Sequence, residues 1–313
     1  MLPKISVITA VLNCEKYIER AIKSVLSQNY PNLEYIVIDG GSTDGTLDTI
    51  EKYRDKIAYF VSEKDNGNCD AQNKGVRAST ADFICYLAGD DWYEEGILIK
   101  AGELIQKYPD TQTITFGARS VILGNAGDFE TIAIYQGNNL DLTLKSVLCS
   151  PLTNSRLFSR KLFDQFGFPN PVNYRGQYFL VNDREFMIRL ALGNVKNRSI
   201  DDIGVTFFGH EDSMTFSKNE ERAFKMFQEY LDIYEDYLKN KPLTFIQRSL
   251  FRTYHRKESI RSVWRDIRNG KYQRAWETAK RGVALNHIVW IIRFIFNPLQ
   301  LQIREFGRKL RKV

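Results

Sequence analysis

Apolar runs of strand length alternate with amphipathic stretches through the first ninety residues of the chain. The runs Ile5–Leu12 and Leu33–Ile38 predict buried strands, and a helix predicted over residues 13–28 has Asn13 as its N-cap. The pattern further predicts helices over Thr46–Tyr53 and Asp70–Ala78 and strands near Ile57–Ser62 and over Phe83–Leu87. Strands that alternate with helices in this way form an α/β fold with a mostly parallel sheet.

The pattern becomes mixed from about residue 93 and helical from residue 216. In the mixed part we expect helices over Glu94–Tyr108, Ser159–Phe166 and Asp183–Leu192, strands over Gln112–Leu123, Thr131–Tyr135 and around Ile203–Phe208, and a loop over Gly167–Gln177. The chain therefore predicts one α/β domain in two halves, residues 1–92 and 93–215, and a helical extension over residues 216–313.

Charge is distributed unevenly along the chain. The 313 residues carry a net charge of +6, but residues 248–313 hold 17 Lys/Arg against 4 Asp/Glu, which leaves the rest acidic. A basic tail on an acidic body suits an anionic lipid surface, nucleic acid or a solvated helical face. Nucleic acid is the weakest of these, because the body is acidic and no nucleic-acid-binding motif is present.

The cysteines and the N-terminal sequence argue against two further classes of protein. Cys14, Cys69, Cys85 and Cys149 are far apart and form no C-x-x-C pair, so we expect neither a zinc site nor a disulfide framework. Residues 1–4 lead directly into a strand-like run, so we expect no secretory signal. These features predict a cytoplasmic protein with reduced thiols.

Polar residues follow three of the predicted strands at their carboxyl ends, in the loops Thr9–Asn13, Asp39–Thr43 and Ala88–Asp91. Ligands of open α/β sheets collect at this edge, because the carboxyl ends of parallel strands lie side by side. We expect all three loops to contribute to one ligand site.

Asp90 and Asp91 are adjacent carboxylates that directly follow an apolar strand and precede Trp92. Such a pair is costly to bury without a cation, and its hard oxygen ligands suit Mg²⁺ or Mn²⁺ carrying a diphosphate. A surface turn with solvated acids is the alternative. The position in line with the Asp39 turn favours the metal site.

The turn that begins at Asp39 reads D-G-G-S-T-D-G-T. A carboxylate at this edge can accept the N–H of a nucleobase, and glycines let a ligand approach the backbone. The alternative is that Asp39 caps the next helix. The turn lacks G-x-G-x-x-G spacing, so it is no dinucleotide fingerprint.

Three other segments carry polar groups. One is a helical stripe that either meets phosphate and sugar hydroxyls or faces solvent, and it consists of Asp70, Asn73, Lys74 and Arg77. Asp183 and Glu185 open a predicted helix, where a carboxylate acts either as a base or as a cap. His210 follows an apolar strand, and a single histidine is more often structural than a ligand.

Five segments carry a family resemblance in their order along the chain. They are Ser6–Asn13, Tyr35–Thr46, Ser62–Gly67 with Asp70–Gly75, Leu87–Asp91, and Asn182–Glu185 with Ile188–Leu190. Together they resemble the inverting, nucleotide-sugar-dependent glycosyltransferases of family 2. The resemblance implies the GT-A fold, with a Rossmann-like sheet whose first half binds the nucleotide sugar and whose second half binds the acceptor.

The resemblance implies a role for each matching residue. Asp183 would be the general base that deprotonates the acceptor hydroxyl, which attacks the sugar opposite the departing diphosphate. Asp91 would bind Mn²⁺ or Mg²⁺, with His210 as an additional metal or phosphate contact. Asp39 would contact the base and Asp90 the ribose. The residues implied in nucleotide binding are Thr9, Ala10, Asn13, Asp39, Asp65, Asn73, Lys74 and Asp90.

The sequence departs from the family pattern at two positions. Family members often carry Glu before the base, where this chain has Asn182, so Glu185 stays an alternative to Asp183. Gly89 stands where many relatives have a third acid, which leaves the last two carboxylates. The Q-x-x-R-W motif and the membrane spans of processive synthases are not found in this sequence, so we expect transfer of one sugar per acceptor.

The resemblance also implies partners. The donor would be a nucleotide sugar, with UDP favoured over GDP and dTDP, and hexosyl or hexosaminyl transfer would go to a glycan or lipid-linked acceptor in cell-surface polysaccharide or lipopolysaccharide synthesis. A nucleotidyltransferase and a non-catalytic binding subunit are the alternatives. Residues 9–13 lack a Gly-rich, basic triphosphate signature, and Asp39, Asp91 and Asp183 are all retained.

The end of the chain predicts an interfacial helix. Val283–Ile303 is apolar, but Arg293, Asn297 and Pro298 interrupt it, so the continuous apolar run is too short to span a bilayer. Basic residues follow it, namely Arg304, Arg308, Lys309, Arg311 and Lys312. We expect peripheral attachment to the cytoplasmic leaflet, the alternatives being packing on the protein's own core or at a homodimer interface.

Overall fold

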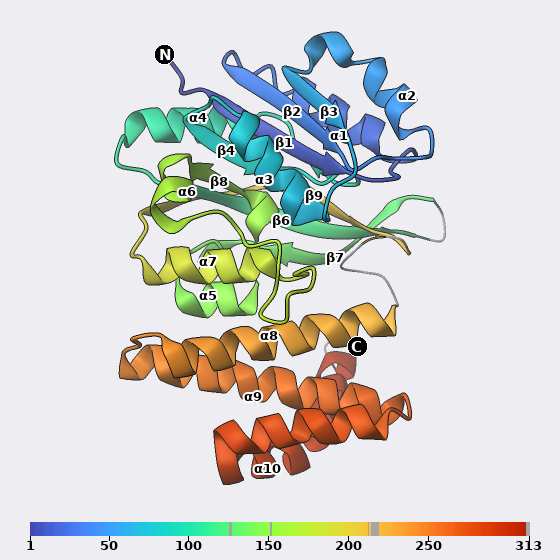
Figure 1. Cartoon of the computed structure of the whole chain (residues 1–313), viewed down its shortest axis with the longest axis vertical. Helices are drawn as coiled ribbons and strands as arrows, with labels where there is room; N and C mark the ends of the chain where they lie inside the picture. Colours follow the sequence, from blue (N-terminus) through green and yellow to red (C-terminus); the bar gives the residue numbers. More distant parts are fainter. Residues whose placement is uncertain (125–126, 151, 212, 214–218, 311–313) are drawn as a thin grey trace. The chain divides into compact units, whose positions relative to one another are not determined.

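The computed structural model describes residues 1–124, 127–150, 152–211, 213 and 219–310, and the side chains of these except for residue 139 and residues 296–310. The chain divides into two compact units, Met1–Lys218 and Asn219–Val313 (Figure 1). We name them the α/β unit and the helical unit.

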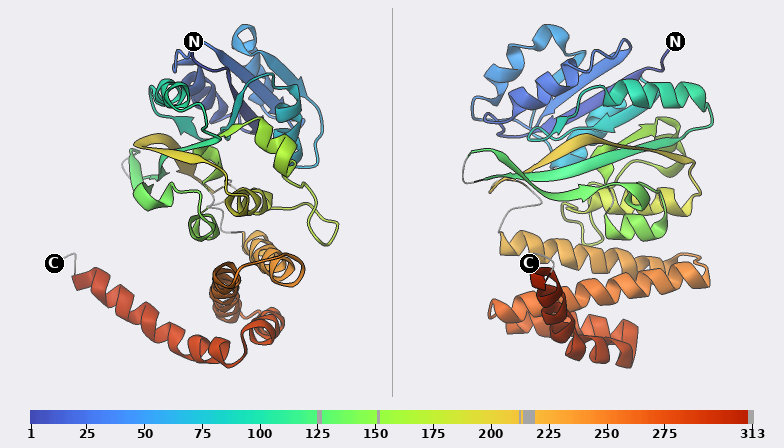
Figure 2. Two further views of the ribbon diagram at one scale, coloured as in Figure 1. Left: turned by 90° about the vertical axis from the view of Figure 1, so that its left-hand side faces the viewer. Right: turned by 180° about the vertical axis from the view of Figure 1, so that it is seen from behind.

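The described strands of the α/β unit form one sheet in the order β3-β2-β1-β4-β8-β6-β9-β5, with β7 paired to β6. Their bounds are β1 Ile5–Val11, β2 Leu33–Asp39, β3 Tyr59–Ser62, β4 Phe83–Tyr86, β5 Trp92–Tyr93, β6 Thr113–Leu123, β7 Phe129–Tyr135, β8 Arg156–Ser159 and β9 Asn197–Gly209. Strands β3, β2, β1 and β4 are parallel, as expected. Strand β8 runs antiparallel between β4 and β6, and the long strands β6 and β9 lie parallel to each other (Figure 2).

Three helices of the α/β unit begin later than the sequence predicts, and one of them is α6, which starts at Lys161 rather than Ser159. Helix α1 starts at Ile18 rather than after Asn13, because Asn13 has a left-handed backbone (φ 50°). Helix α4 starts at Ile97 rather than at Glu94, since Gly96 is also left-handed (φ 75°). The helices are α1 Ile18–Leu26, α2 Thr46–Glu51, α3 Asn68–Ala78, α4 Ile97–Lys107, α5 Leu144–Cys149, α6 Lys161–Phe166 and α7 Asn182–Leu192, with short 3₁₀ turns at Arg54–Lys56, Gly137–Asn139 and Thr153–Ser155.

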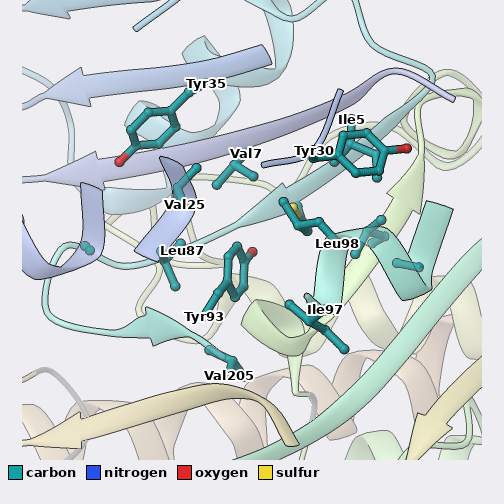
Figure 3. Packing of buried hydrophobic residues seen from close by; sticks show 14 of the residues in the cluster. Ile5, Val7, Val25, Tyr30, Tyr35, Leu87, Tyr93, Ile97, Leu98 and Val205 are labelled. Carbon is teal, nitrogen blue, oxygen red and sulfur yellow. The ribbon is translucent and has the colours of Figure 1, made fainter. Parts of the chain in front are cut away.

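Helices cover both faces of the sheet. On β1, Ile5 and Val7 face a fully buried cluster that includes residues of α1 and α4 (Figure 3). Ile8 faces the opposite side and packs on α3, where a Cβ at Gly75 would lie only 2.4 Å from Ile8 Cγ2. Apolar groups thus fill both faces, which leaves the edges of the sheet for polar chemistry.

The helical unit contains α8 Glu220–Asn240, α9 Phe245–Arg268 and α10 Tyr272–Leu310. The backbone of α10 is not helical at His287 (φ 49°, ψ −141°), and the helix changes direction there (Figure 2). Over the described ranges, no helix combines the length and the apolar character needed to cross a bilayer.

The segment after His287 divides its apolar residues between two environments. Trp290 is buried, donates a 2.7 Å hydrogen bond from Nε1 to Ser259 and stacks on Phe294 with ring centroids 5.0 Å apart. Five other apolar residues are exposed, namely Ile288, Val289, Ile291, Ile292 and Ile295. The side chains of Asn297, Pro298, Arg304, Arg308 and Lys309, and all of Arg311 and Lys312, lie outside the described part of the chain.

Candidate functional site

The three strand-end loops meet at the carboxyl edge of the sheet, as the sequence predicts. Val11 pairs with Asp39 across β1 and β2, and the Gly40 amide donates to the Val11 carbonyl at 2.9 Å. On the other side of β1, the Leu87 amide donates to the Ile8 carbonyl at 3.0 Å. Asn13 connects two of the loops, since its Oδ1 accepts from the Thr43 amide at 2.9 Å.

Asp39 is fully buried and uses its carboxylate to hold its own turn. Its Oδ2 accepts from the amides of Gly41 and Ser42, both at 2.9 Å, and from Ser62 Oγ at 2.7 Å. Asp39 therefore fixes the shape of the turn that follows β2 and ties it to the end of β3. Contact of this carboxylate with a base stays a prediction.

The other residues near this turn that are predicted to bind the nucleotide differ in solvent exposure. Thr9 is fully buried with its hydroxyl 3.2 Å from that of Tyr35, whereas Ala10 is half-buried. Asp65 lies against Gly40, where an added Cβ would meet Asp65 Oδ2 at 2.6 Å. The structure thus brings Asp65 to the Asp39 turn and turns Thr9 toward the interior.

Two predicted residues on α3 are held by different partners. Asn73 is buried, and its Nδ2 donates to the Pro169 carbonyl at 2.9 Å, while its Oδ1 is buried without a partner among the described residues. Lys74 forms an ion pair with Glu63 at 2.7 Å. Asn73 consequently connects α3 to the loop that precedes α7.

That loop packs directly over the start of α3. Gly67 has a φ of 98°, and a Cβ there would lie 2.3 Å from Tyr178 Cε2, so only glycine admits the ring. The sequence predicts the loop Gly167–Gln177 but gives no signal that Tyr178 covers the residues after β3.

Asp91 connects the ends of β4 and β9. It is 7% exposed, and its Oδ1 accepts from the Phe208 amide at 3.0 Å. Burial raises the pKa of Asp91 well above its usual range and the charge of Asp90 raises it further, whereas the Phe208 amide and Arg20 act in the opposite direction. The Phe208 amide and Arg20 thus do not fully offset the cost of burying the negative charge of Asp91.

Asp90 faces His210, whose Nε2 lies 3.0 Å from Asp90 Oδ2. The His210 ring lies 4.4 Å from the ring of Tyr17 between centroids, and its Nδ1 is buried without a partner among the described residues. The backbone of Asp90 accepts a 2.9 Å hydrogen bond from Arg20. His210 therefore lies beside the carboxylate pair with Asp90 as its partner, and its contact with a metal or phosphate stays a prediction.

Arg20 is a residue that the sequence did not single out, because nothing in the pattern of α1 distinguishes it from a solvated arginine. Its guanidinium lies 3.9 Å from the ring centre of Trp92 and 4.9 Å from that of Phe208. An arginine over aromatic faces gains cation–π attraction in addition to its charge interactions. Arg20 is thus the resident cation beside Asp90 and Asp91.

The residues at this edge fit a divalent cation. Two adjacent carboxylates with one nearby arginine offer hard oxygen ligands and surplus negative charge. Within the described residues, no group of three or more His, Cys, Asp or Glu forms a complete metal cage, so water or a ligand would complete the coordination. A Cβ at Gly89 would meet Val11 at 3.0 Å and Cys14 at 3.1 Å, so this position has little room for a third acid.

Asp183 lies in the first turn of α7 and accepts from Thr153 Oγ1 at 3.3 Å. Burial raises the pKa of Asp183, although Arg184, a backbone amide and Thr153 act against it. Its charge adds to burial in raising the pKa of the Cys69 thiol to about 12, which places Asp183 near the start of α3. The sequence did not indicate that Thr153 contacts Asp183, because the two residues are 30 positions apart.

Glu185 was the alternative to Asp183. It forms an ion pair with Arg189 at 3.0 Å within the same helix. The side-chain partner of Asp183 is the neutral hydroxyl of Thr153, so its negative charge is less neutralised than that of Glu185. Asp183 is therefore the better candidate for the base.

Comparison with known proteins gives one matching family model and several relatives. A model described as "Glycosyl transferase family 2" matches residues 6–167. The putative teichuronic acid biosynthesis glycosyltransferase TuaG of Bacillus subtilis is 33% identical over 108 residues, which cover 34% of this chain and 43% of TuaG. The matched region spans about 30% to 55% of the first curated relatives.

Solved structures share the fold across nearly the whole chain. TarS of S. aureus matches with a TM-score of 0.62 and 16% identity, covering 92% of this chain and 55% of TarS. The mannosyltransferase PcManGT of Pyrobaculum calidifontis, solved with GDP-Man and Mn²⁺, matches with a TM-score of 0.59 and 15% identity, covering 96% and 81%. These likenesses confirm the GT-A fold with a C-terminal helical region.

Proposed function

Because the chain belongs to glycosyl transferase family 2, we propose that it transfers one sugar from a nucleotide-diphosphate sugar to a hydroxyl of a glycan or lipid-linked acceptor, with inversion at the sugar carbon. The main support is a pair of buried carboxylates whose pKa values burial raises, Asp91 directly after β4 and Asp183 in the first turn of α7. Asp91 follows β4, and Asp183 lies near the start of α3, which follows β3.

The donor class is supported by the solved structures of the same fold. TarS residues 1–349 were solved with UDP-GlcNAc, and PcManGT with GDP-Man. In this chain the donor would lie along the loops held by Asp39 and Asn13, with Asp65 and Lys74 at their edge. UDP-hexoses and UDP-hexosamines are the first donors to test, and cell-surface polysaccharide is the proposed destination, as for TuaG.

A divalent metal is part of this proposal. Asp91, Asp90 and His210 would hold Mn²⁺ or Mg²⁺ together with the donor diphosphate. When bound, such an ion neutralises the negative charge that develops on the leaving diphosphate. The Nδ1 of His210, which is buried and has no partner among the residues that the structure describes, is an additional ligand atom at this place.

Asp183 would act as the general base. The acceptor hydroxyl gives its proton to the Asp183 carboxylate as its oxygen attacks the sugar, and the nucleoside diphosphate leaves from the opposite side. A pKa raised by burial makes this carboxylate a stronger base than a solvated aspartate. Thr153 would act as a positioning residue, since its hydroxyl orients the Asp183 side chain.

The exposed apolar residues between Ile288 and Ile295 support peripheral attachment of the helical unit to an anionic leaflet. The basic composition of residues 248–313 complements such a surface. Anionic vesicles should retain the full-length protein, and Ile288→Ser with Ile292→Ser should release it. The opposite result would be that neither protein binds vesicles and that the wild type is a dimer which the variant dissociates. The exposed apolar residues would then be the interface with a second copy of the chain rather than with lipid.

Calorimetry with UDP, GDP and dTDP, each with and without Mn²⁺, tests the donor site first. We expect one nucleotide to bind in a metal-dependent manner in the wild type and not in Asp91→Ala. Absence of binding for all three nucleotides under both conditions would contradict the transferase proposal and favour a non-catalytic member of the fold.

A further inference from the structure

The helical unit contains a cavity of about 420 Å³ that the proposed transfer reaction does not use. Its lining residues come from all three described helices and are Glu235, Leu238, Lys239, Arg248, Arg252, Arg281, Ala284 and Leu285. Four of them are cations and one is an acid. The volume lies in the range of about 300–1,000 Å³ that is typical of small-molecule sites.

Arg281 is the one lining cation whose charge is fully matched within the unit. Its Nε donates to Glu235 Oε1 at 2.8 Å and its Nη2 to Asp232 Oδ1 at 2.7 Å. A third bond, from Nη1 to Gln228 at 2.6 Å, fixes the plane of the guanidinium. Arg281 therefore forms a rigid wall of the cavity rather than a free binding group.

Glu235, the acid of the cavity, is matched as well. It accepts from Arg281 and also from His255 Nε2 at 2.9 Å. Burial lowers the pKa of His255, although Glu235 opposes this. Glu235 and Asp232 share the single charge of Arg281, so these three side chains together keep one surplus negative charge. The other three lining cations, Lys239, Arg248 and Arg252, outnumber this surplus charge and make the cavity positive for an incoming anion.

The other three cations have no carboxylate partner in the described structure. Arg248 donates from Nη1 to the Leu238 carbonyl at 2.7 Å, which anchors it across the end of α8 and leaves its remaining N–H groups available. For Arg252 and Lys239, the described residues supply no ion pair. Arg248 and Arg252 are four residues apart on α9, so they project from the same face of the helix.

We propose that this cavity binds a phosphate-type oxyanion, a phosphomonoester or diphosphate group, through Arg248 and Arg252 with Lys239 at its edge. Arginine binds phosphate through parallel N–H···O bonds, and two guanidinium groups on one wall suit a dianion. The group would belong either to a soluble phosphate ester or to a lipid headgroup. Phe245 and Ile246, 87% and 71% exposed, begin the same helix and would suit the lipid source.

The soluble source is tested by titrating glycerol phosphate and inorganic pyrophosphate into the full-length protein in the presence of a chelator. The variant Arg248→Gln with Arg252→Gln should weaken binding by at least about tenfold. The matched control is Lys257→Gln with Arg261→Gln, which removes two charges at the same spacing from α9 and should bind like the wild type. Asp91→Ala should also bind like the wild type, because its metal site is in the other unit.

The lipid source is tested by sedimentation with phosphatidylcholine vesicles that contain phosphatidic acid. Retention of the wild type and of the α9 control, with loss in the Arg248/Arg252 variant and recovery when both are lysine, would assign the cavity to a headgroup. Thermal unfolding checks that every variant is folded. If neither soluble phosphates nor vesicles distinguish the cavity variant from its control, the proposed site does not exist, whatever the outcome at Asp91.

Discussion

Asp91 and Asp183 of the α/β unit differ from Glu235 of the helical unit in how their negative charge is compensated. In the α/β unit, burial raises the pKa of Asp91 and of Asp183, and few local donors offset it. In the helical unit, burial also acts on Glu235, but hydrogen bonds from His255 and Arg281 outweigh it, and its pKa is lowered. The first two carboxylates cost folding free energy at neutral pH, whereas the third contributes to it.

This difference separates acids kept for chemistry from acids kept for structure. Carboxylates that are buried without matching donors are concentrated at functional sites, where a ligand or a reaction uses their charge. A carboxylate with its own cation and imidazole holds helices together. Substitution of Asp91 or Asp183 should therefore affect activity and stability in the opposite way to substitution of Glu235.

The largest effect is expected for Asp183→Asn. Removal of the base should lower turnover by about 10²- to 10⁴-fold while nucleotide binding is unchanged, because the amide cannot take the acceptor proton. The measurement is transfer with a matched donor and acceptor, alongside calorimetry. Glu185→Gln is the control, and near-normal turnover is expected from it; if Glu185→Gln is inactive and Asp183→Asn active, the base is Glu185.

Asp91→Asn should separate binding from stability. Metal-dependent nucleotide binding should fall to the metal-free level, while the thermal midpoint without metal should rise by about 2–4 °C, since a buried charge is removed and the amide oxygen still accepts from Phe208. Differential scanning calorimetry measures the second effect. Asp48→Asn, at an exposed position of α2, should change neither. A lower midpoint in Asp91→Asn would show that the carboxylate is structural.

Glu235→Gln should lower stability and leave transfer activity unchanged, the reverse of what is expected for Asp91→Asn. The free energy of unfolding of the helical unit should fall by roughly 1 kcal/mol, a figure reduced by the partial exposure of the side chain, with transfer activity unchanged. Because the pKa of Glu235 is lowered, its contribution is present above the ordinary glutamate range and is lost as the pH falls through the lowered pKa. Urea unfolding at several pH values should therefore show wild type and variant converging in acid. A constant difference would exclude this charge as the cause.

Thr153→Val should give the smallest effect. The Thr153 hydroxyl lowers the pKa of Asp183, so its removal raises that pKa further and moves the acidic limb of the kcat/KM profile to higher pH. Thr153→Ser keeps the hydroxyl and should keep the profile. A uniform loss of rate with an unmoved acidic limb would mean that Thr153 acts only through packing.

The first half of the sheet follows from the sequence, and in the second half the sequence predicts β6, β7 and the end of β9 but neither β5 nor β8. Strands β1 and β2 are continuous apolar runs with turn residues after them, so local pattern is sufficient. Strand β8 has only four residues and contains the fully buried Arg156, and β5 has two residues paired with β9. These short strands form because strands distant in the sequence pair with them, and the local sequence pattern does not show such pairing.

The candidate site divides in the same way. Asp91 and Asp183 could be predicted because each follows or opens a recognisable element and matches a family motif. Thr153, Arg20 and Tyr178 reach the site through contacts across long sequence separations, and their types alone do not distinguish them from surface residues. The prediction that Asn13 caps the first helix was wrong, because the Asn13 side chain accepts a hydrogen bond from the Thr43 amide instead.

Trp92 provides an optical signal for one part of this molecule. It directly follows Asp91, its ring lies under the Arg20 guanidinium, and the other three tryptophans, Trp264, Trp276 and Trp290, all belong to the helical unit. In a protein with Trp264, Trp276 and Trp290 all replaced by phenylalanine, tryptophan emission excited beyond the tyrosine absorption band would therefore come from the carboxylate edge alone. An ion or a nucleotide arriving beside Asp91 would change the field on that indole, so occupancy could be followed without a label and on the millisecond scale of a stopped-flow experiment.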